Sequence, residues 1–262
     1  MPADTLSLAG KAAIVTGSGR ENGIGAAIAR ALARNGASVA VHYVSERSAE
    51  RALKTAQSIR DEFGVRVALV QADVSTPEGA RKIVAQTLEQ LKVDHVDILV
   101  NNAGAGGVMP LVEVDLATIQ NVFGANVSGP IFLTQEVLAL GKMPRGGRVI
   151  NIGSIASKLG PPGMALYAAS KAAQDSLTAS WAAELGRSHG ITVNTVAPGP
   201  VMTDIIDEFP GVVEPLIAMQ RGADHGAAPE DIADAVLLIA SEKSRWITAK
   251  FIAVDAGVSG TM

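Results

Sequence analysis

Residues 12–25 read AAIVTGSGRENGIG, a short apolar run that leads into a glycine-rich turn. After the turn, Ile24, Ile28 and Leu32 recur four residues apart, which is the spacing of one helix face. A strand, a glycine turn and a helix in this order let backbone amides approach a phosphate at the positive end of the helix dipole. The segment therefore predicts a dinucleotide-binding unit, although such glycine turns also occur as ordinary turns.

The rest of the chain repeats this alternation of apolar strands and amphipathic helices. Strands with near-continuous apolar content are buried on both faces, as parallel strands covered by helices are. The pattern predicts an α/β fold, a Rossmann-like doubly wound parallel sheet of about seven strands, in a single domain over residues 1–262. The predicted strands are 12–16, 39–41, 65–70, 96–100, 148–152, 191–196 and 251–254, and the helices after the first are one from about 46, then 77–91, 119–140, 165–188 and 229–240.

Composition excludes several classes of function. With 48% hydrophobic and 18% charged residues, the 262-residue chain is not a disordered one. A net charge of −4 without a basic stripe argues against nucleic-acid binding. Cysteine is absent and the four histidines lack metal-ligand spacing, so no metal site is predicted. The absence of a leader pattern and of any apolar run of about 18 residues predicts a soluble, cytoplasmic protein without a membrane partner.

The end of the second predicted strand bears on the choice of cofactor. An acidic residue there would accept a hydrogen bond from the ribose 2′-hydroxyl and select NAD. Residues 41–45, VHYVS, contain none. Arg20 could grip a 2′-phosphate, with Tyr43 and Ser45 as hydrogen-bond donors, which predicts NADP(H). The alternative is that Arg20 is only a solvated loop cation.

Three polar side chains suggest a catalytic group. Tyr167 and Lys171 lie four residues apart on one face of a predicted helix, and Ser154 follows a strand at the edge where doubly wound sheets bind ligands. A neighbouring ammonium is expected to lower the pKa of the phenol, which can then exchange a proton with an alcohol or alkoxide. The serine hydroxyl would hold the carbonyl oxygen. From spacing alone, a Tyr–Lys surface pair remains an alternative.

The order of these and further motifs resembles the short-chain dehydrogenase/reductase family, from the glycine loop to the last strand. The resemblance implies a ketoreductase that transfers hydride from NADPH to a ketone while Tyr167 protonates the alkoxide. It also implies a homodimer or homotetramer. The matching residues are Thr16 and Gly17 with Gly23, Ile24 and Gly25, then Asp73, Asn101, Asn102, Ala103, Gly104, Asn126, Ser154, Tyr167, Lys171, Pro198 and Gly199.

The resemblance also assigns roles to individual residues. Asn126 would bend its helix and hold a water in a proton relay to Lys171, and with Ser154 and Tyr167 these form the catalytic set. From the residues alone, Asp73 could instead cap a helix and Asn126 could be an exposed helix residue. The predicted cofactor-binding residues are Gly17, Gly19, Arg20, Gly23, Ile24, Gly25, Tyr43, Ser45, Asp73, Val74, Asn102, Ala103, Gly104, Tyr167, Lys171, Pro198, Gly199, Val201 and Thr203.

Two features depart from the family pattern. Five residues, 18–22, separate Gly17 from Gly23, where the family usually has three, so the glycine loop is two residues longer. His42 stands where many members have a smaller polar residue beside the ribose phosphate, which admits mixed cofactor use.

Residues 204–226 carry prolines and glycines with little periodicity, which predicts an irregular substrate lid. The predicted substrate pocket consists of Ser154, Ile155, Leu159, Met164, Met202 and Phe209. The alternative is that its apolar residues only pack in the core. The pocket lining suggests an apolar, cyclic or aromatic ketone, and the family resemblance implies one of polyketide or 3-oxoacyl type. By the resemblance, the Tyr167–Lys171 spacing argues against enoyl-thioester reductases. An NADP-binding protein with a cyclase-like or sensor role stays open, because a fold does not fix a reaction.

Overall fold

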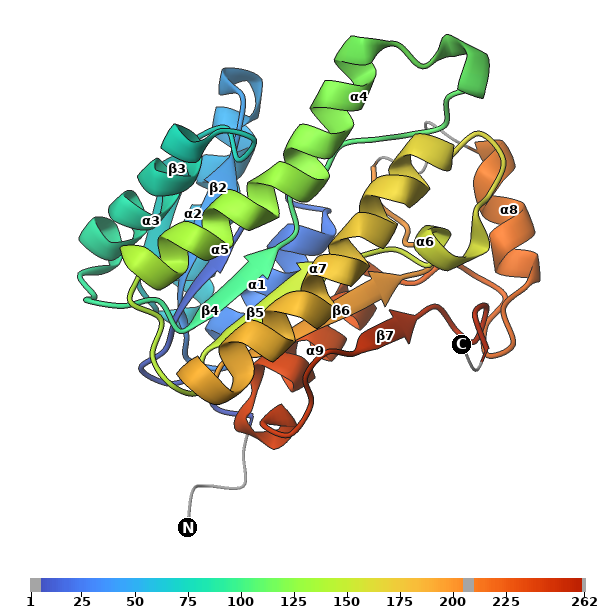
Figure 1. The fold of residues 1–262 in the computed structure, drawn as a ribbon. Coiled ribbons are helices and arrows are strands. Elements are labelled where there is room, and N and C mark those ends of the chain that lie inside the picture. Colours follow the sequence, from blue (N-terminus) through green and yellow to red (C-terminus); the bar gives the residue numbers. More distant parts are fainter. Residues whose placement is uncertain (1–5, 205–209, 261–262) are drawn as a thin grey trace.

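The computed structural model describes residues 6–204 and 210–260 and contains one parallel sheet flanked by helices (Figure 1). The strand order is β3-β2-β1-β4-β5-β6-β7, and every pairing is parallel. This confirms the predicted fold class. The strands are β1 Ala12–Val15, β2 Ser38–Tyr43, β3 Val67–Gln71, β4 Ile98–Asn101, β5 Arg148–Ile152, β6 Thr192–Pro198 and β7 Phe251–Val254.

Alternating side chains of β1 belong to two separate hydrophobic cores. In β1, Ala13 and Val15 belong to one core, whereas Ala12 and Ile14 belong to the other. The first core includes residues of α1 (Ile24–Arg34), α2 (Ala49–Phe63) and α9 (Pro229–Ala240). The second includes residues of α3 (Pro77–Leu91), α5 (Gly129–Ala139) and α7 (Ala165–His189). Strands covered on both faces are mostly apolar at successive positions, which is why their sequences do not alternate.

Two predicted boundaries are wrong. The helix predicted over 119–140 is divided: α4 (Leu116–Phe123) begins after Asp115, whose carboxylate accepts a hydrogen bond from the Thr118 amide at 2.7 Å, and the π-helical segment Gly124–Ser128 separates α4 from α5. Within residues 204–226, predicted to be irregular, Pro210–Ala218 form helix α8. A proline inside that helix, Pro215, hid its pattern from sequence analysis.

None of the helices in the described ranges has the length and apolar content that crossing a bilayer requires.

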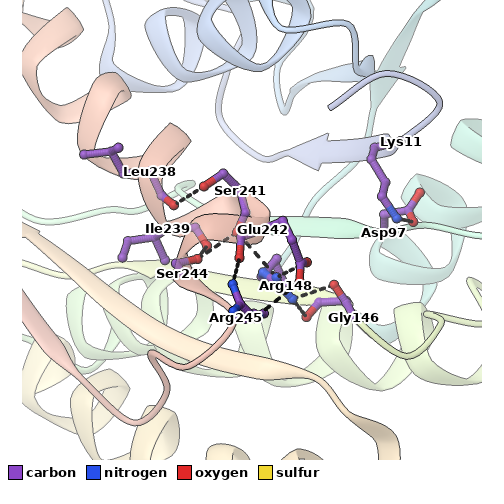
Figure 2. Close-up of polar contacts among 11 residues, drawn as sticks. Lys11, Asp97, Gly146, Arg148, Leu238, Ile239, Ser241, Glu242, Ser244 and Arg245 are labelled. Carbon is purple, nitrogen blue, oxygen red and sulfur yellow. Dashed lines mark hydrogen bonds and ion pairs between the residues drawn. The ribbon is translucent and has the colours of Figure 1, made fainter. Parts of the chain in front are cut away.

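Charged side chains fix the amino ends of the central strands (Figure 2). Arg148 opens β5 and is only 3% exposed. Its guanidinium donates to the carbonyls of Gly146 (2.6 Å), Gly147 (3.2 Å) and Ser241 (3.4 Å), and it pairs with Glu242 at 3.3 Å. The arginine thus ties the start of β5 to the segment after α9. These contacts lie at the amino edge of the sheet. Ligands of such sheets bind at the opposite, carboxyl edge.

A substitution tests how much this arrangement contributes to stability. Arg148→Met keeps most of the side-chain volume but leaves three carbonyls without their charged donor, so the free energy of unfolding should fall by about 1–3 kcal/mol. Urea unfolding measures the loss. Glu242→Gln is the matched control, because Glu242 is 61% exposed and its removal should cost no more than about 1 kcal/mol. Equal stability of Arg148→Met and wild type would show that the buried arginine is dispensable.

Candidate active site

Glycines let the ends of β1 and β4 meet at the carboxyl edge of the sheet. Gly17 has a φ of +64°, and a Cβ there would lie 2.9 Å from the Cα of Ala103. A Cβ on Gly25 would lie 2.6 Å from the carbonyl oxygen of Gly17. Gly23 is the N-cap of α1 and provides no side-chain cap. The amino end of α1 is therefore open to an anion, as a phosphate-binding turn requires.

The buried ring of His42 hydrogen-bonds the glycine loop. It is 2% exposed; its Nδ1 accepts a hydrogen bond from the Gly17 amide at 3.0 Å, and its Nε2 lies 2.9 Å from the Ala72 carbonyl. This pattern requires a neutral ring with the proton on Nε2. Burial lowers the pKa of His42 from 6.5 to about 4, which keeps the ring neutral. His42 also lines the cleft described below, so its expected place beside the ribose phosphate, and the mixed cofactor use that it admits, stay predictions.

A cleft of about 730 Å³ follows the carboxyl edge of the sheet from β2 to β6. Ser45 lies outside its lining, and the Ser45 hydroxyl instead lies 3.0 Å from that of Ser48. The other predicted cofactor-binding residues all line it, namely Gly17, Gly19, Arg20, Gly23, Ile24, Gly25, Tyr43, Asp73, Val74, Asn102, Ala103, Gly104, Tyr167, Lys171, Pro198, Gly199, Val201 and Thr203.

Sequence reasoning missed several polar residues of this cleft, and three of them lie at one end of it. Arg47, Ser48 and Arg51 line it together with Arg20 and Tyr43. The signal was two arginines within eight residues of the end of β2, in a stretch that sequence analysis treated only as the start of a polar helix. Three arginines in one cleft make this end strongly cationic and suited to a phosphate.

Asp73 lies on the same end of the cleft and does not cap a helix. Thr76 is the N-cap of α3, since its hydroxyl accepts a hydrogen bond from the Gly79 amide at 3.0 Å. The Asp73 carboxylate instead accepts from the amide and the hydroxyl of Ser75, at 2.9 and 2.7 Å.

At the other end of the cleft, α7 presents Tyr167 and Lys171. Lys171 is 4% exposed, which rules out the interpretation as a surface pair. Its ammonium donates to the Ile152 carbonyl at 2.7 Å and lies 5.7 Å from the centre of the Tyr167 ring. Burial lowers the pKa of Lys171 to about 8, against the opposing effect of the Asp175 charge.

The pKa of Tyr167 shifts in the direction opposite to the one predicted. Desolvation by the surrounding protein raises it, and the smaller effect of a hydrogen bond with Ser154 lowers it. The predicted lowering does not prevail, because desolvation of the phenol outweighs the effect that lowers its pKa. The phenol is therefore protonated at neutral pH, the form that donates a proton.

Asn126 lies in the π-helical segment and is fully buried, which excludes an exposed helix residue. Its amide nitrogen donates to the Ala105 carbonyl at 2.8 Å and to the Ser170 hydroxyl at 2.9 Å, and its oxygen accepts from the Ala105 amide at 2.8 Å. A Cβ on Gly104 would lie 3.0 Å from this oxygen and 3.7 Å from Lys171 Nζ. The π turn thus holds the segment after β4 close to the lysine, and such turns often mark functional sites.

Ser154 follows β5 and is held by its neighbours. Its hydroxyl accepts a hydrogen bond from the Ala156 amide at 3.1 Å. Ser157 and Lys158, in the short helix α6 (Ala156–Leu159), contact the carboxylate of Asp175 in α7 at 2.7 and 3.0 Å. These contacts fix the turn that carries Ser154 against the helix that carries Tyr167.

The substrate end of the cleft contains most of the predicted pocket. Ser154, Ile155, Leu159 and Met164 line it, with Val213 and Leu216 of α8, which lie in the predicted lid over residues 204–226. Assignment of Met202 is wrong: it is 49% exposed and outside this lining, and a Cβ on Gly226 would lie 2.7 Å from its sulfur. Phe209 lies outside the described residues.

Comparison with known proteins identifies the family. A family model described as enoyl-(acyl carrier protein) reductase matches residues 17–259. Short-chain dehydrogenase/reductase FrzI from Cladobotryum sp is 37% identical over 260 residues, which cover 96% of this chain and 97% of FrzI. The chain belongs to the short-chain dehydrogenase/reductase family.

Two other similar proteins have more specific names. Hydroxynaphthalene reductase arp2 from Aspergillus fumigatus is 36% identical over 260 residues, covering 94% of this chain and 91% of arp2. The crystal structure of landomycin C-6 ketoreductase LanV, with bound NADP and rabelomycin, matches with a TM-score of 0.84 and 35% identity over 96% of this chain and 97% of that one. As a short-chain dehydrogenase/reductase, this protein is an oxidoreductase that acts on C=O or CH–OH groups.

The buried histidine of this short-chain dehydrogenase/reductase predicts a pH dependence of stability. Between pH 6.5 and about 4, the unfolded chain binds a proton on His42 that the folded chain does not, so the free energy of unfolding should fall by up to about 3 kcal/mol as pH decreases. His42→Gln can form the same two hydrogen bonds without titrating and should flatten this dependence in urea unfolding. His225→Gln is the control, because His225 is 78% exposed. An unchanged pH dependence in His42→Gln would contradict the assignment.

Proposed function

We propose that the protein is an NADPH-dependent ketoreductase that reduces an apolar, cyclic or aromatic ketone, of polyketide or 3-oxoacyl type, to a secondary alcohol. One observation carries the proposal: a single cleft joins a cationic, glycine-lined end to an end where Tyr167, Ser154 and Lys171 meet an apolar wall. The first end suits the phosphates of a dinucleotide and the second suits a carbonyl compound.

The residues present fit NADP(H). The glycine contacts leave no room for side chains between the turn and the segment after β4, so main-chain amides face the cleft at the amino end of α1. Arg20, Arg47 and Arg51 offer bidentate donors for a 2′-phosphate. No carboxylate ends β2, whose last residue is Tyr43. Lys171 and Thr203 would hold the nicotinamide half.

Side chains of the protein would orient the substrate and donate the proton. When bound, NADPH supplies the hydride for the carbonyl carbon. The Ser154 hydroxyl would hold the carbonyl oxygen, and Tyr167 would give that oxygen its phenolic proton as negative charge develops. The raised pKa of Tyr167 supports this direction, because a protonated phenol acts as the acid of a reduction. Lys171, whose pKa is lowered to about 8, would supply positive charge beneath the phenol once the proton leaves.

The lining of the cleft supports the substrate class. Ile155, Leu159, Met164, Val213 and Leu216 form an apolar wall with few hydrogen-bonding groups, as suits a flat hydrophobic ketone. The names of arp2 and LanV, and the rabelomycin bound to LanV, point to the same class. A ketone is favoured over an enoyl thioester by the four-residue spacing of Tyr167 and Lys171.

The described part of 204–226, with α8, would cover the substrate within a single domain of residues 1–262. Homodimeric or homotetrameric assembly and a cytoplasmic location stay predictions.

The test is NADPH oxidation, followed at 340 nm, with a panel of cyclic ketones, quinones, naphthol keto forms and 3-oxoacyl thioesters. Tyr167→Phe removes only the ionisable hydroxyl, so kcat should fall by about 10²- to 10⁴-fold. NADPH binding, measured by fluorescence titration, should stay within about three-fold of wild type, since the phenol is one of many contacts. Trp246→Phe is the control, because Trp246 is 95% exposed.

Two outcomes would contradict the proposal. Wild-type turnover by Tyr167→Phe would remove the phenol from the proton transfer. Product formation without any change in NADPH absorbance would indicate a cyclase-like reaction instead.

A further inference from the structure

Asp204 connects two segments that are distant in the sequence. Its Oδ2 lies 2.6 Å from Arg51 Nη2, and its Oδ1 lies 3.4 Å from Asn22 Nδ2. Arg51 belongs to α2, Asn22 to the glycine loop, and Asp204 to the segment after β6. Both carboxylate oxygens are therefore engaged by residues from the opposite part of the cleft.

The contact spans the cleft rather than bordering one end of it. Arg51 lines the cationic end with Arg20 and Arg47, whereas Thr203, next to Asp204, lines the catalytic end. The two segments follow β2 and β6, which are four strand positions apart in the sheet, or about 19 Å at the usual spacing. The glycine loop, with Asn22, lies between them. A dinucleotide extended along this edge has its pyrophosphate at that loop.

The charges at this contact favour its closure. The hydrogen bonds from Arg51 and Asn22, and then the charges of Arg51 and Arg20, hold the pKa of Asp204 below its usual range. The carboxylate is therefore ionised at neutral pH. Arg51 is 44% and Asp204 38% exposed, so neither group bears a large desolvation cost and the contact can open and close.

We propose that Asp204 is a positioning residue for the cofactor: its contacts with Arg51 and Asn22 form a clasp across the cleft that slows the release of bound NADP(H). The inference rests on the proposed use of NADP(H). It also gives a role to the longer glycine loop, because Asn22 is one of the five residues that separate Gly17 from Gly23.

A different role for Arg51 predicts an opposite result. If Arg51 acts only as a ligand of the 2′-phosphate, Asp204 competes with that phosphate. Removal of the carboxylate would then free Arg51 and slow NADPH release, with no effect on NADH. If the contact is a clasp, removal of the carboxylate should instead speed the release of NADPH. It should speed the release of NADH equally, because the clasp does not depend on the 2′-phosphate.

Stopped-flow fluorescence measures the release of NADPH and of NADH from the full-length protein without any substrate. Asp204→Asn should raise both release rate constants by about two- to five-fold, the range expected for a partly exposed ion pair. Arg51→Gln should raise NADH release similarly, and the double variant should add little. The difference should shrink in 1 M salt, where the Debye length is about 3 Å. Asp234→Asn is the matched control, since Asp234 forms an exposed pair with Arg34 at 3.1 Å on another surface.

Unchanged or slower NADPH release from Asp204→Asn, with normal thermal unfolding, would overturn the clasp and leave the proposed function intact. Failure of the wild-type protein to bind NADPH or NADH at all would overturn both proposals.

Discussion

Thr16 and Asn102 hold the ends of β1 and β4 together, and the whole cleft depends on this junction. The Thr16 hydroxyl accepts hydrogen bonds from the amides of Asn102 and Ala103 at 3.0 and 2.9 Å, and the Asn102 side chain donates to the Thr16 carbonyl at 2.7 Å. The chain leaves β1 toward β2 and β3 and later returns to place β4 on its other side, so the two loops diverge exactly where ligands bind in such sheets. Gly17 fits this junction because it has no side chain.

The same junction explains why the catalytic groups can be so deeply placed. The segment that follows Asn102 lies against Asn126 and Lys171, and Gly104 leaves room for both because it has no side chain. Lys171 then hydrogen-bonds the Ile152 carbonyl at the end of β5, so its ammonium is fixed by the sheet. Burial has a consequence for chemistry: it lowers the pKa of Lys171 to about 8 and raises the pKa of Tyr167, which keeps the proton on the phenol. Geometry and electrostatics therefore favour proton donation from the phenol.

The fold could be predicted because the seven strands are mostly apolar and the glycine turn follows the first. Asn126, Ser154, Tyr167 and Lys171 could be predicted as the catalytic set because they stand in a recognisable order. Other features required the structure. The π turn at Asn126 depends on side-chain bonds to Ala105 and Ser170, which no local pattern encodes. The position of His42 depends on burial against Ala72, a residue of another strand's end. Arg51 joins the cleft through the packing of α2, and Pro215 concealed α8.

The two hydrophobic cores and the substrate wall use different residues. Leu159, Met164, Val213 and Leu216 line the catalytic end of the cleft, and all four are described residues outside both core clusters. Stability is supplied by the sheet and its covering helices, whereas the shape of the substrate site is supplied by α6, the loop before α7, and α8. Laboratory evolution of new substrate ranges can therefore concentrate on these four positions, because changes in their size leave the packing that folds the chain intact.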